Sequence, residues 1–336
     1  MPGWGTVCGM EAPDAPSVDL RDLQAAHERT KAFVTRTPTV PAPALSTRLG
    51  VEVWLKAELL QTTGSFKLRG VLNALLQLDE SQRTAGVVSM SAGNHAAALA
   101  YGARIAATRA VVVMPQYANP AKLAATASYG GEVIRTDRPL AEVMAEVQSE
   151  RGLTLVHPFD DLRVIAGAGG VGLELVEDGP KLDVIVVPVG GGGLISGVAA
   201  AVRVLSPQAR VVGVEPARAA GMTAAIRAGQ PVQLEKAQSV ADGLAALFAG
   251  HHTLACVQSW VDSVVLVDEP DLIAAVGVLA REAKLAAEPA GAAGLAALLS
   301  GKLELEPGSR VALVISGGNI DPALLASAVT TPAERS

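Results

Sequence analysis

The chain of 336 residues alternates short apolar runs with longer segments that have the spacing of amphipathic helices. The apolar runs are bounded by turn residues, as β-strands are. Because strands that alternate with helices are joined by crossovers, this pattern predicts mostly parallel sheets with right-handed connections. The first helix is expected over residues 19–34, and the expected strands read VEVWLKAE, AGVVSMS, RAVVVMPQ, GEVIRTD, LTLVHP, DVIVVPVG, RVVGVEP, SVVLVDE and RVALVISGG.

Length and composition predict an α/β fold with two lobes. The chain is longer than one typical domain, 50% of its residues are hydrophobic and 3% are aromatic. A core of alanine, valine, leucine and isoleucine suits helices packed on both faces of open, mostly parallel sheets. We expect a loose tail over residues 1–18, a large domain formed by residues 19–84 and 159–330, and a small domain over residues 85–158.

Charge and cysteine content argue against several classes of protein. The net charge is −6 and the basic residues are not clustered, so nucleic acid is not an expected partner. The sequence has no run of about 18 uncharged apolar residues, which a membrane span requires, so none is expected. The first residues read unlike a signal peptide, and Cys8 and Cys256 lack disulfide or metal spacing. We therefore expect a cytoplasmic protein with Cys256 in its core.

Four consecutive glycines, Gly190 to Gly193, separate an expected strand from a helix that should begin near Leu194. Without β-carbons, their backbone N–H groups can converge on an anion at the positive end of that helix, so the loop suits a phosphate. No Gly-Lys-Ser/Thr follows, which disfavours a nucleotide triphosphate. The alternative is a tight turn with close helix packing.

Two other polar stretches follow strand ends, where ligands of parallel sheets bind. SAGNH, residues 91–95, offers a hydroxyl, backbone N–H groups and an amide, and SGGNID, residues 316–321, offers another hydroxyl and amide. Together with the glycine loop and Lys67 of TGSFKLRG they form a candidate pocket. Taken singly, each is also typical of a turn, a helix cap or a solvated lysine.

The stretch GAGGVG, residues 167–172, matches G-x-G-x-x-G and offers a rival function, that of an NAD-dependent dehydrogenase. The preceding LRVIA is a short strand at best, and Asp183 opens a strand where the motif requires an acid that closes one. The favoured interpretation is a glycine-rich helix start where backbones pack closely.

Six motifs in order, GSFKLRG, SAGNH, HPFDD, GGGGLISG, VADGLA and SGGNID, resemble those of the pyridoxal-phosphate enzymes of the tryptophan-synthase-β type, fold type II. Their wording is most similar to the threonine and serine dehydratases, or ammonia-lyases, with serine racemase a near relative. The resemblance covers most of residues 20–325. It implies a homodimer, and because the chain ends soon after SGGNID, no C-terminal regulatory domain is expected.

The resemblance also implies roles for individual residues. Lys67 would form a Schiff base with pyridoxal 5'-phosphate and take the α-proton of the substrate. The implied cofactor contacts are Phe66 and Gly243 on the two faces of the ring, Asn94 at the ring hydroxyl, Gly190, Gly191, Gly192, Gly193 and Leu194 at the phosphate, and Ser316 at the ring nitrogen. The implied substrate loop consists of Ser91, Ala92, Gly93 and His95, of which His95 also suits a packing role.

Departures from the family pattern bear on the reaction. Ala92 stands where serine racemases carry the serine that serves the opposite face of the ring, and Phe159 stands where they carry an asparagine, so racemisation is disfavoured. Ala168 with Gly170, in IAGAGG, replaces a polar pair that we expect near the pocket. Ala290 likewise replaces a serine. Both departures leave open the possibility of a roomier, less polar pocket that accepts a bulkier substrate.

Two acidic residues have open roles. Glu215 matches the first ligand of a divalent-cation site of some relatives, but Gly221 occupies the position of the last, so we expect no obligatory metal. Glu215 should instead be solvated or face a helix. Glu288 either touches the pocket or merely begins a helix beside Pro289.

We therefore expect a pyridoxal-phosphate-dependent ammonia-lyase that eliminates water from a small β-hydroxy amino acid of the L-threonine or L-serine type, giving a 2-oxo acid and ammonia. One alternative is a bulkier substrate such as 3-hydroxyaspartate or phenylserine. Others are an amino acid racemase, a β-replacement enzyme of the cysteine synthase kind, and a catalytically silent amino acid sensor.

Overall fold

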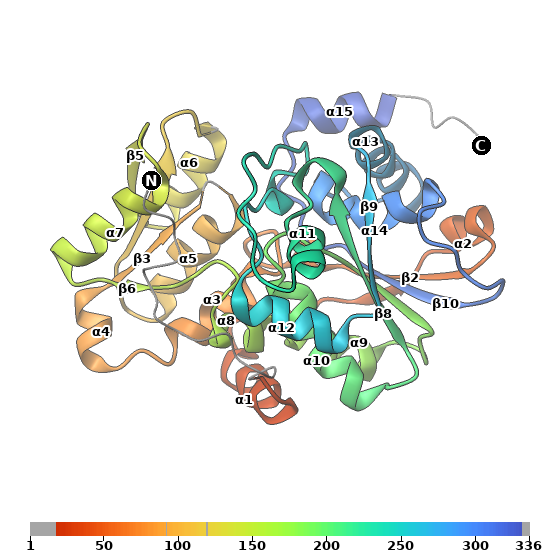
Figure 1. Cartoon of the computed structure of the whole chain (residues 1–336), viewed down its shortest axis with the longest axis horizontal. Helices are drawn as coiled ribbons and strands as arrows, with labels where there is room; N and C mark the ends of the chain where they lie inside the picture. Colours follow the sequence, from red (N-terminus) through yellow and green to blue (C-terminus); the bar gives the residue numbers. More distant parts are fainter. Residues whose placement is uncertain (1–17, 92, 119, 331–336) are drawn as a thin grey trace.

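The strands of the computed structural model, which describes residues 18–91, 93–118 and 120–330, form two sheets. Figure 1 shows the smaller sheet at the left and the larger at the right. The four-stranded sheet has the order β5-β4-β3-β6 and the six-stranded sheet the order β1-β2-β10-β7-β8-β9. The bounds are β1 Thr39–Pro41, β2 Glu52–Lys56, β3 Val87–Met90, β4 Ala110–Pro115, β5 Glu132–Thr136, β6 Thr154–Leu155, β7 Val184–Pro188, β8 Arg210–Pro216, β9 Ser263–Val267 and β10 Arg310–Val314.

All nine expected strands are present, and their pairings are parallel. Strand β1 was not expected from the sequence; it pairs antiparallel with β2 at the edge of the large sheet. This strand has three residues and ends at Pro41, too short for a period-2 pattern and tolerable for a proline because it lies at an edge. The predicted α/β class with mostly parallel sheets is confirmed.

Helices cover both faces of each sheet, as expected. Around the large sheet, α13 and α14 lie on one face and α9, α10 and α12 on the other. Around the small sheet, α5 packs on one face with α3, and α7 packs on the other. The bounds are α1 Leu20–Thr30, α2 Pro43–Leu49, α3 Lys67–Leu75, α4 Glu80–Ala85, α5 Asn94–Ile105, α6 Pro120–Ser128, α7 Leu140–Arg151, α8 Leu162–Ala168, α9 Gly170–Asp178, α10 Gly193–Leu205, α11 Gly221–Ala228, α12 His251–Trp260, α13 Glu269–Val278, α14 Pro289–Leu299 and α15 Pro322–Thr330, with short helical turns η2 Glu58–Leu60, η3 Ala217–Ala219, η4 Asp242–Leu244 and η5 Leu279–Ala283.

Alternation along the buried strands divides the core. In β7, Val184 and Val186 face the cluster with α13 and α14, whereas Ile185 and Val187 face the cluster with α9 and α10. Successive side chains of a strand point to opposite faces, so a strand that is apolar throughout can bury both. This explains why the expected strands were uniformly apolar.

Two local predictions about elements need correction. The stretch LRVIA is not a strand, because Leu162 begins α8, with Asp161 as its N-cap accepting a hydrogen bond from the N–H of Arg163. An aspartate just before an apolar run is a helix-start signal that the apolar composition obscured. The first helix ends at Thr30, earlier than expected, because the chain turns there before β1.

Some expectations fall outside what the structure tests. The proposed tail over residues 1–18 lies outside the described residues except for Val18. The domain boundaries near residues 84 and 158 stay a prediction. Among the described residues, no helix combines the length and apolar character needed to cross a bilayer.

Candidate active site

Lys67 is the first residue of α3, and its amine is held in a confined position. The Nζ atom donates a hydrogen bond of 2.8 Å to the carbonyl of Pro158 and lies 5.0 Å from the centre of the Phe66 ring. Burial lowers the pKa of the Lys67 amine to about 8, so a substantial fraction is neutral near pH 7 to 8. A neutral amine can attack a carbonyl carbon or accept a proton. The alternative of a freely solvated lysine is therefore wrong.

The loop that carries Lys67 is joined to the end of the last strand. The N–H of Phe66 donates to the carbonyl of Ser316 (3.0 Å), and the N–H of Gly318 donates to the carbonyl of Gly64 (2.9 Å). These bonds form an isolated antiparallel bridge between Ser65 and Gly317. The stretches GSFKLRG and SGGNID, far apart in sequence, therefore lie side by side, as a shared pocket requires.

Asn94, the first residue of α5, is held by two polar partners. Its Nδ2 donates to Oε1 of Glu288 (2.6 Å), and its Oδ1 accepts from Nδ2 of Asn319 (2.8 Å). Asn319 belongs to SGGNID and Glu288 to AEPAG, so three stretches meet at one amide. Of the two roles left open for Glu288, contact with the predicted pocket residues is correct.

The glycine loop joins β7 to α10, which begins at Gly193, close to the expected start at Leu194. Gly192 has φ +95°, which favours glycine. A β-carbon at Gly191 would lie 2.3 Å from the Phe159 ring, and one at Gly190 would lie 3.0 Å from Cα of Leu244. The loop therefore lies against Phe159 on one side and the VADGLA turn on the other.

Gly243, predicted for one face of the cofactor ring, lies in η4 beside that loop. A β-carbon there would lie 3.2 Å from Cβ of Ala290 and 3.9 Å from Oε1 of Glu288. A β-carbon at Gly190 would in turn lie 3.3 Å from the carbonyl oxygen of Gly243. The predicted phosphate loop, ring face and Asn94 contact thus form one connected set.

The stretch HPFDD places Phe159 and caps a helix. Asp160 accepts hydrogen bonds from the N–H groups of His251, His252 and Thr253 at the start of α12. The Phe159 ring packs edge-on against His157, with ring centres 4.6 Å apart. This stretch therefore supports the wall against which the glycine loop packs.

His95 and His157 are unsuited to proton transfer at neutral pH. Burial, reinforced by the charge of Lys67, lowers the pKa of His95 to about 3, and burial lowers the pKa of His157 to about 4. The Nε2 of His95 contacts the Ser89 hydroxyl (3.1 Å). The Nδ1 of His157 accepts from the N–H of Asp160 (2.8 Å). His95 is therefore buried and packed, as the alternative of a packing role expected.

Of the predicted substrate loop, Ser91 and Gly93 precede α5, and His95 is the second residue of that helix. The Ser91 hydroxyl accepts from the N–H of Gly93 (3.2 Å), and the space where a β-carbon of Gly93 would project is open to 4 Å. Ala92 lies outside the described residues. An open backbone turn at a helix start suits a carboxylate.

Glu215 acts on α11 and is not solvated. It is fully buried and accepts hydrogen bonds from the N–H groups of Met222 and Thr223 and from the Thr223 hydroxyl. The expectation that it faces a helix is correct, and the expectation of solvation is wrong. Its two carboxylate oxygens are engaged by the helix start.

GAGGVG does not form a dinucleotide site, because it joins α8 to α9 and follows no strand. A β-carbon at Gly167 would lie 2.5 Å from the carbonyl oxygen of Arg69, and one at Gly169 would lie 2.4 Å from Leu23. The favoured interpretation of close backbone packing is confirmed. Gly170 faces Arg69 and His27, so the expectation that this position opens the substrate pocket is wrong.

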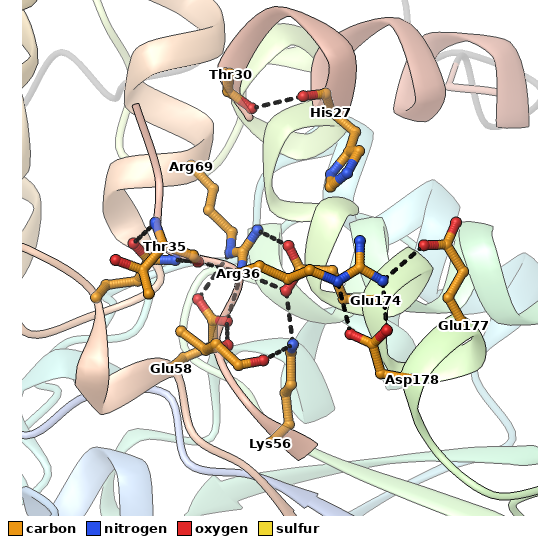
Figure 2. A network of polar contacts seen from close by, with 12 residues as sticks. His27, Thr30, Thr35, Arg36, Lys56, Glu58, Arg69, Glu174, Glu177 and Asp178 are labelled. Atoms are coloured by element: carbon orange, nitrogen blue, oxygen red, sulfur yellow. Dashed lines mark hydrogen bonds and ion pairs between the residues drawn. The ribbon is translucent and has the colours of Figure 1, made fainter. Parts of the chain in front are cut away.

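A buried ion cluster that includes Arg69 of α3 was not foreseen (Figure 2). The Arg69 guanidinium binds both Glu58 and Glu174 through hydrogen bonds of 2.7 to 2.9 Å, and Nζ of Lys56 donates to Glu174 (2.6 Å). All four side chains are at most 1% exposed. The cluster links β2, η2, α3 and α9. Its member on α3, Arg69, comes two residues after Lys67 in the sequence. Charged residues in otherwise apolar segments were the signal for it.

The residues fit a phosphorylated aldehyde cofactor. Lys67 supplies an amine that is partly neutral, and the glycine loop supplies a turn where a β-carbon at Gly191 or Gly192 would clash. Ser316 is buried next to the Lys67 loop. An amine, an anion-binding turn and a neutral hydroxyl match the groups that such a cofactor presents.

Comparisons with known proteins point in the same direction. The sequence profile described as "Pyridoxal-phosphate dependent enzyme" matches residues 30–317. The chain is 43% identical over 307 residues to L-threonine ammonia-lyase of Thermotoga maritima, covering 90% of this chain and 76% of that protein. It is 39% identical over 312 residues to serine racemase of Arabidopsis thaliana, covering 91% and 94%. A solved structure of maize serine racemase is similar with a TM-score of 0.88 at 36% identity, covering 92% and 96%.

Proposed function

Because the chain belongs to the pyridoxal-phosphate-dependent enzyme family and so uses pyridoxal phosphate as its cofactor, we propose that it is an ammonia-lyase. The reaction is α,β-elimination of water from a β-hydroxy amino acid of the L-threonine or L-serine type. The products are a 2-oxo acid and ammonia. The observation that carries this proposal is the confined Lys67 amine, joined through its own loop to Ser316.

The residues of the chain divide the work. Pyridoxal phosphate supplies an aldehyde that binds amines and a ring that accepts electrons. Gly190 to Gly193 would hold its phosphate, and Ser316 would serve the ring nitrogen, where a neutral hydroxyl stabilises positive charge less than a carboxylate would. The neutral Nζ of Lys67 accepts the α-proton of the substrate. Lys67 would pass this proton to the β-hydroxyl, which leaves as water, and the enamine that remains would hydrolyse to the 2-oxo acid and ammonia.

Elimination is favoured over inversion because inversion needs a proton donor on the face opposite Lys67. The sequence has alanine at position 92, whose methyl group neither holds nor transfers a proton. His95 and His157 are deprotonated at neutral pH. Racemisation is the second candidate, since a serine racemase is nearly as similar to this chain as the ammonia-lyase is.

Assembly, location and domain division belong to the same proposal. A homodimer is what the family resemblance implies. A cytoplasmic location is consistent with Cys256, a buried free thiol whose pKa burial raises to about 12. A small domain over residues 85–158 is supported by the sheet that β3 to β6 form.

Product release by the cofactor-loaded enzyme tests the proposed activity. Formation of 2-oxo acid and ammonia is measured with L- and D-serine, L- and D-threonine, 3-hydroxyaspartate and phenylserine, with Lys67→Ala as the control. We expect L-threonine and L-serine to react fastest and the control to be inactive. Reaction of D-isomers alone, or of amino acids without a β-leaving group, would refute the proposal.

A further inference from the structure

Glu288 has a position that its place in the helix does not explain. It precedes Pro289 as the N-cap residue of α14, yet its side chain makes no capping hydrogen bond. It is 5% exposed, and its Oε1 accepts from Nδ2 of Asn94 at 2.6 Å. Burying a carboxylate costs free energy that the amide donor of Asn94 offsets in part. A group kept in such a place points to a role beyond the helix start.

The carboxylate of Glu288 lies where the predicted cofactor contacts converge. A β-carbon at Gly317 would lie 2.2 Å from Oε1 of Glu288 and 3.2 Å from Nδ2 of Asn94. The main chain is also fixed, because the N–H of Glu288 donates to the carbonyl of Gly317 (3.1 Å). Residue 317 must therefore be glycine for Glu288 to reach Asn94.

The Asn94 amide is constrained from both ends. Asn319 donates to its oxygen, and Glu288 accepts from its nitrogen. Together these bonds fix which way the amide points, since reversing it would bring two donors together and two acceptors together. An amide nitrogen carries two N–H groups, so one of them stays available for a ligand.

We propose that Glu288 is a positioning residue for pyridoxal phosphate: its carboxylate holds the Asn94 amide so that the remaining N–H donates to the ring hydroxyl of the cofactor. This inference rests on the proposed contact between Asn94 and that hydroxyl. It does not depend on which amino acid the enzyme consumes. A hydrogen bond to a charged acceptor is roughly twice as strong as one to a neutral acceptor, so the charge of Glu288 strengthens the orientation.

The ionisation of Glu288 is sensitive to its surroundings. Burial, reinforced by the charge of Asp242, raises the pKa of Glu288 to about 7, while Asn94 and Lys122 act in the opposite direction. Asp242 comes from η4 and Lys122 from α6, and the two form an ion pair. The hold on Asn94 is therefore expected to be strongest above neutral pH.

The test compares Glu288→Gln with Glu215→Gln, which changes another buried carboxylate that bonds to α11 and not to Asn94. The readouts are the dissociation constant of pyridoxal phosphate and the visible absorption of the bound cofactor between pH 6 and 9. We expect Glu288→Gln to weaken cofactor binding by roughly tenfold and to alter the pH dependence of the spectrum. Glu215→Gln should leave both unchanged, and Glu288→Asp should fall between Glu288→Gln and the wild type.

A double-variant cycle with Asn94→Ala separates positioning from general destabilisation. If Glu288 acts through Asn94, Glu288→Gln has no further effect once Asn94 is alanine. Equal losses in both backgrounds, or an unchanged dissociation constant and spectrum in Glu288→Gln, would overturn the inference. An enzyme that binds the cofactor as described but acts on another substrate would refute the proposed function and leave this inference intact.

Discussion

The amine of Lys67 donates a 2.8 Å hydrogen bond to the carbonyl of Pro158, 91 residues further along the chain. Lys67 begins α3, and Pro158 lies between β6 of the small sheet and α8. The amine predicted to bind the cofactor is thus anchored to the connection that leaves the small sheet. A fixed, poorly solvated amine should have a lowered pKa, and its reactivity should depend on the residues around it.

The pKa of Lys67 predicts its reactivity with pH. Burial favours the neutral amine and lowers the pKa to about 8, so acylation of Lys67 should rise with a midpoint near pH 8. Competitive acetylation of the cofactor-free enzyme, quantified for this lysine by peptide mass spectrometry, measures that midpoint against a free lysine derivative in the same tube. A midpoint close to the usual value of about 10.4 would show that the amine is solvated.

Gly191→Ala tests the glycine loop. The added methyl carbon would lie 2.3 Å from the Phe159 ring, so the loop or the ring must move, and we expect cofactor binding to weaken by at least tenfold. Gly294→Ala in α14 is the matched control, because its methyl carbon would meet Val186 at 3.4 Å, an ordinary contact. Adding Phe159→Ala to Gly191→Ala should restore part of the lost affinity. Unchanged binding in Gly191→Ala would contradict the role of the loop.

Sequence patterns predicted the strands well and the environment of the polar residues poorly. The apolar runs predicted nine strands correctly, because parallel strands are buried on both faces and are therefore apolar throughout. The helical start at Leu162 was missed because apolar residues alone do not distinguish a short strand from a buried helix. Lys67, Asn94 and the glycine loop were predicted as site residues because each lies in a distinctive motif. The bond from Asn94 to Glu288 was not, since no local pattern reports a contact across 194 residues.

Arg69→Met tests the buried ion cluster. It would leave Glu58 and Glu174 buried with Lys56 as their remaining cation in the cluster, and breaking such a pair costs about 3–5 kcal/mol. We expect a matching fall in the free energy of unfolding, measured by urea denaturation of the cofactor-free enzyme. Arg138→Met, which removes an exposed pair with Glu146, should leave the unfolding midpoint nearly unchanged. Equal effects of the two variants would argue against a special role for the cluster.

Glu288→Gln should change how stability depends on pH. The folded-state pKa of Glu288, about 7, lies above the unfolded value near 4.5, so its contribution is fully present below pH 4.5 and is lost as pH rises through 7. The cofactor-free variant should therefore gain thermal stability relative to the wild type between pH 5.5 and 8.5. Scanning calorimetry across that range measures the difference, with the exposed Glu150→Gln as control. A difference that stays constant with pH would show that Glu288 does not titrate there.

The central claim is that proton removal by Lys67 leads to elimination and not to inversion. By the family resemblance, Ala92→Ser supplies the serine that serine racemases carry at this position, so it should raise the share of D-serine formed from L-serine. The gain should appear without loss of cofactor, as judged by visible absorption.

The most direct measurement is the ratio of pyruvate to D-serine formed when the cofactor-loaded wild-type enzyme acts on L-serine. We predict that pyruvate and ammonia form in equal amounts and that D-serine is a minor product. D-serine as the main product would contradict the account.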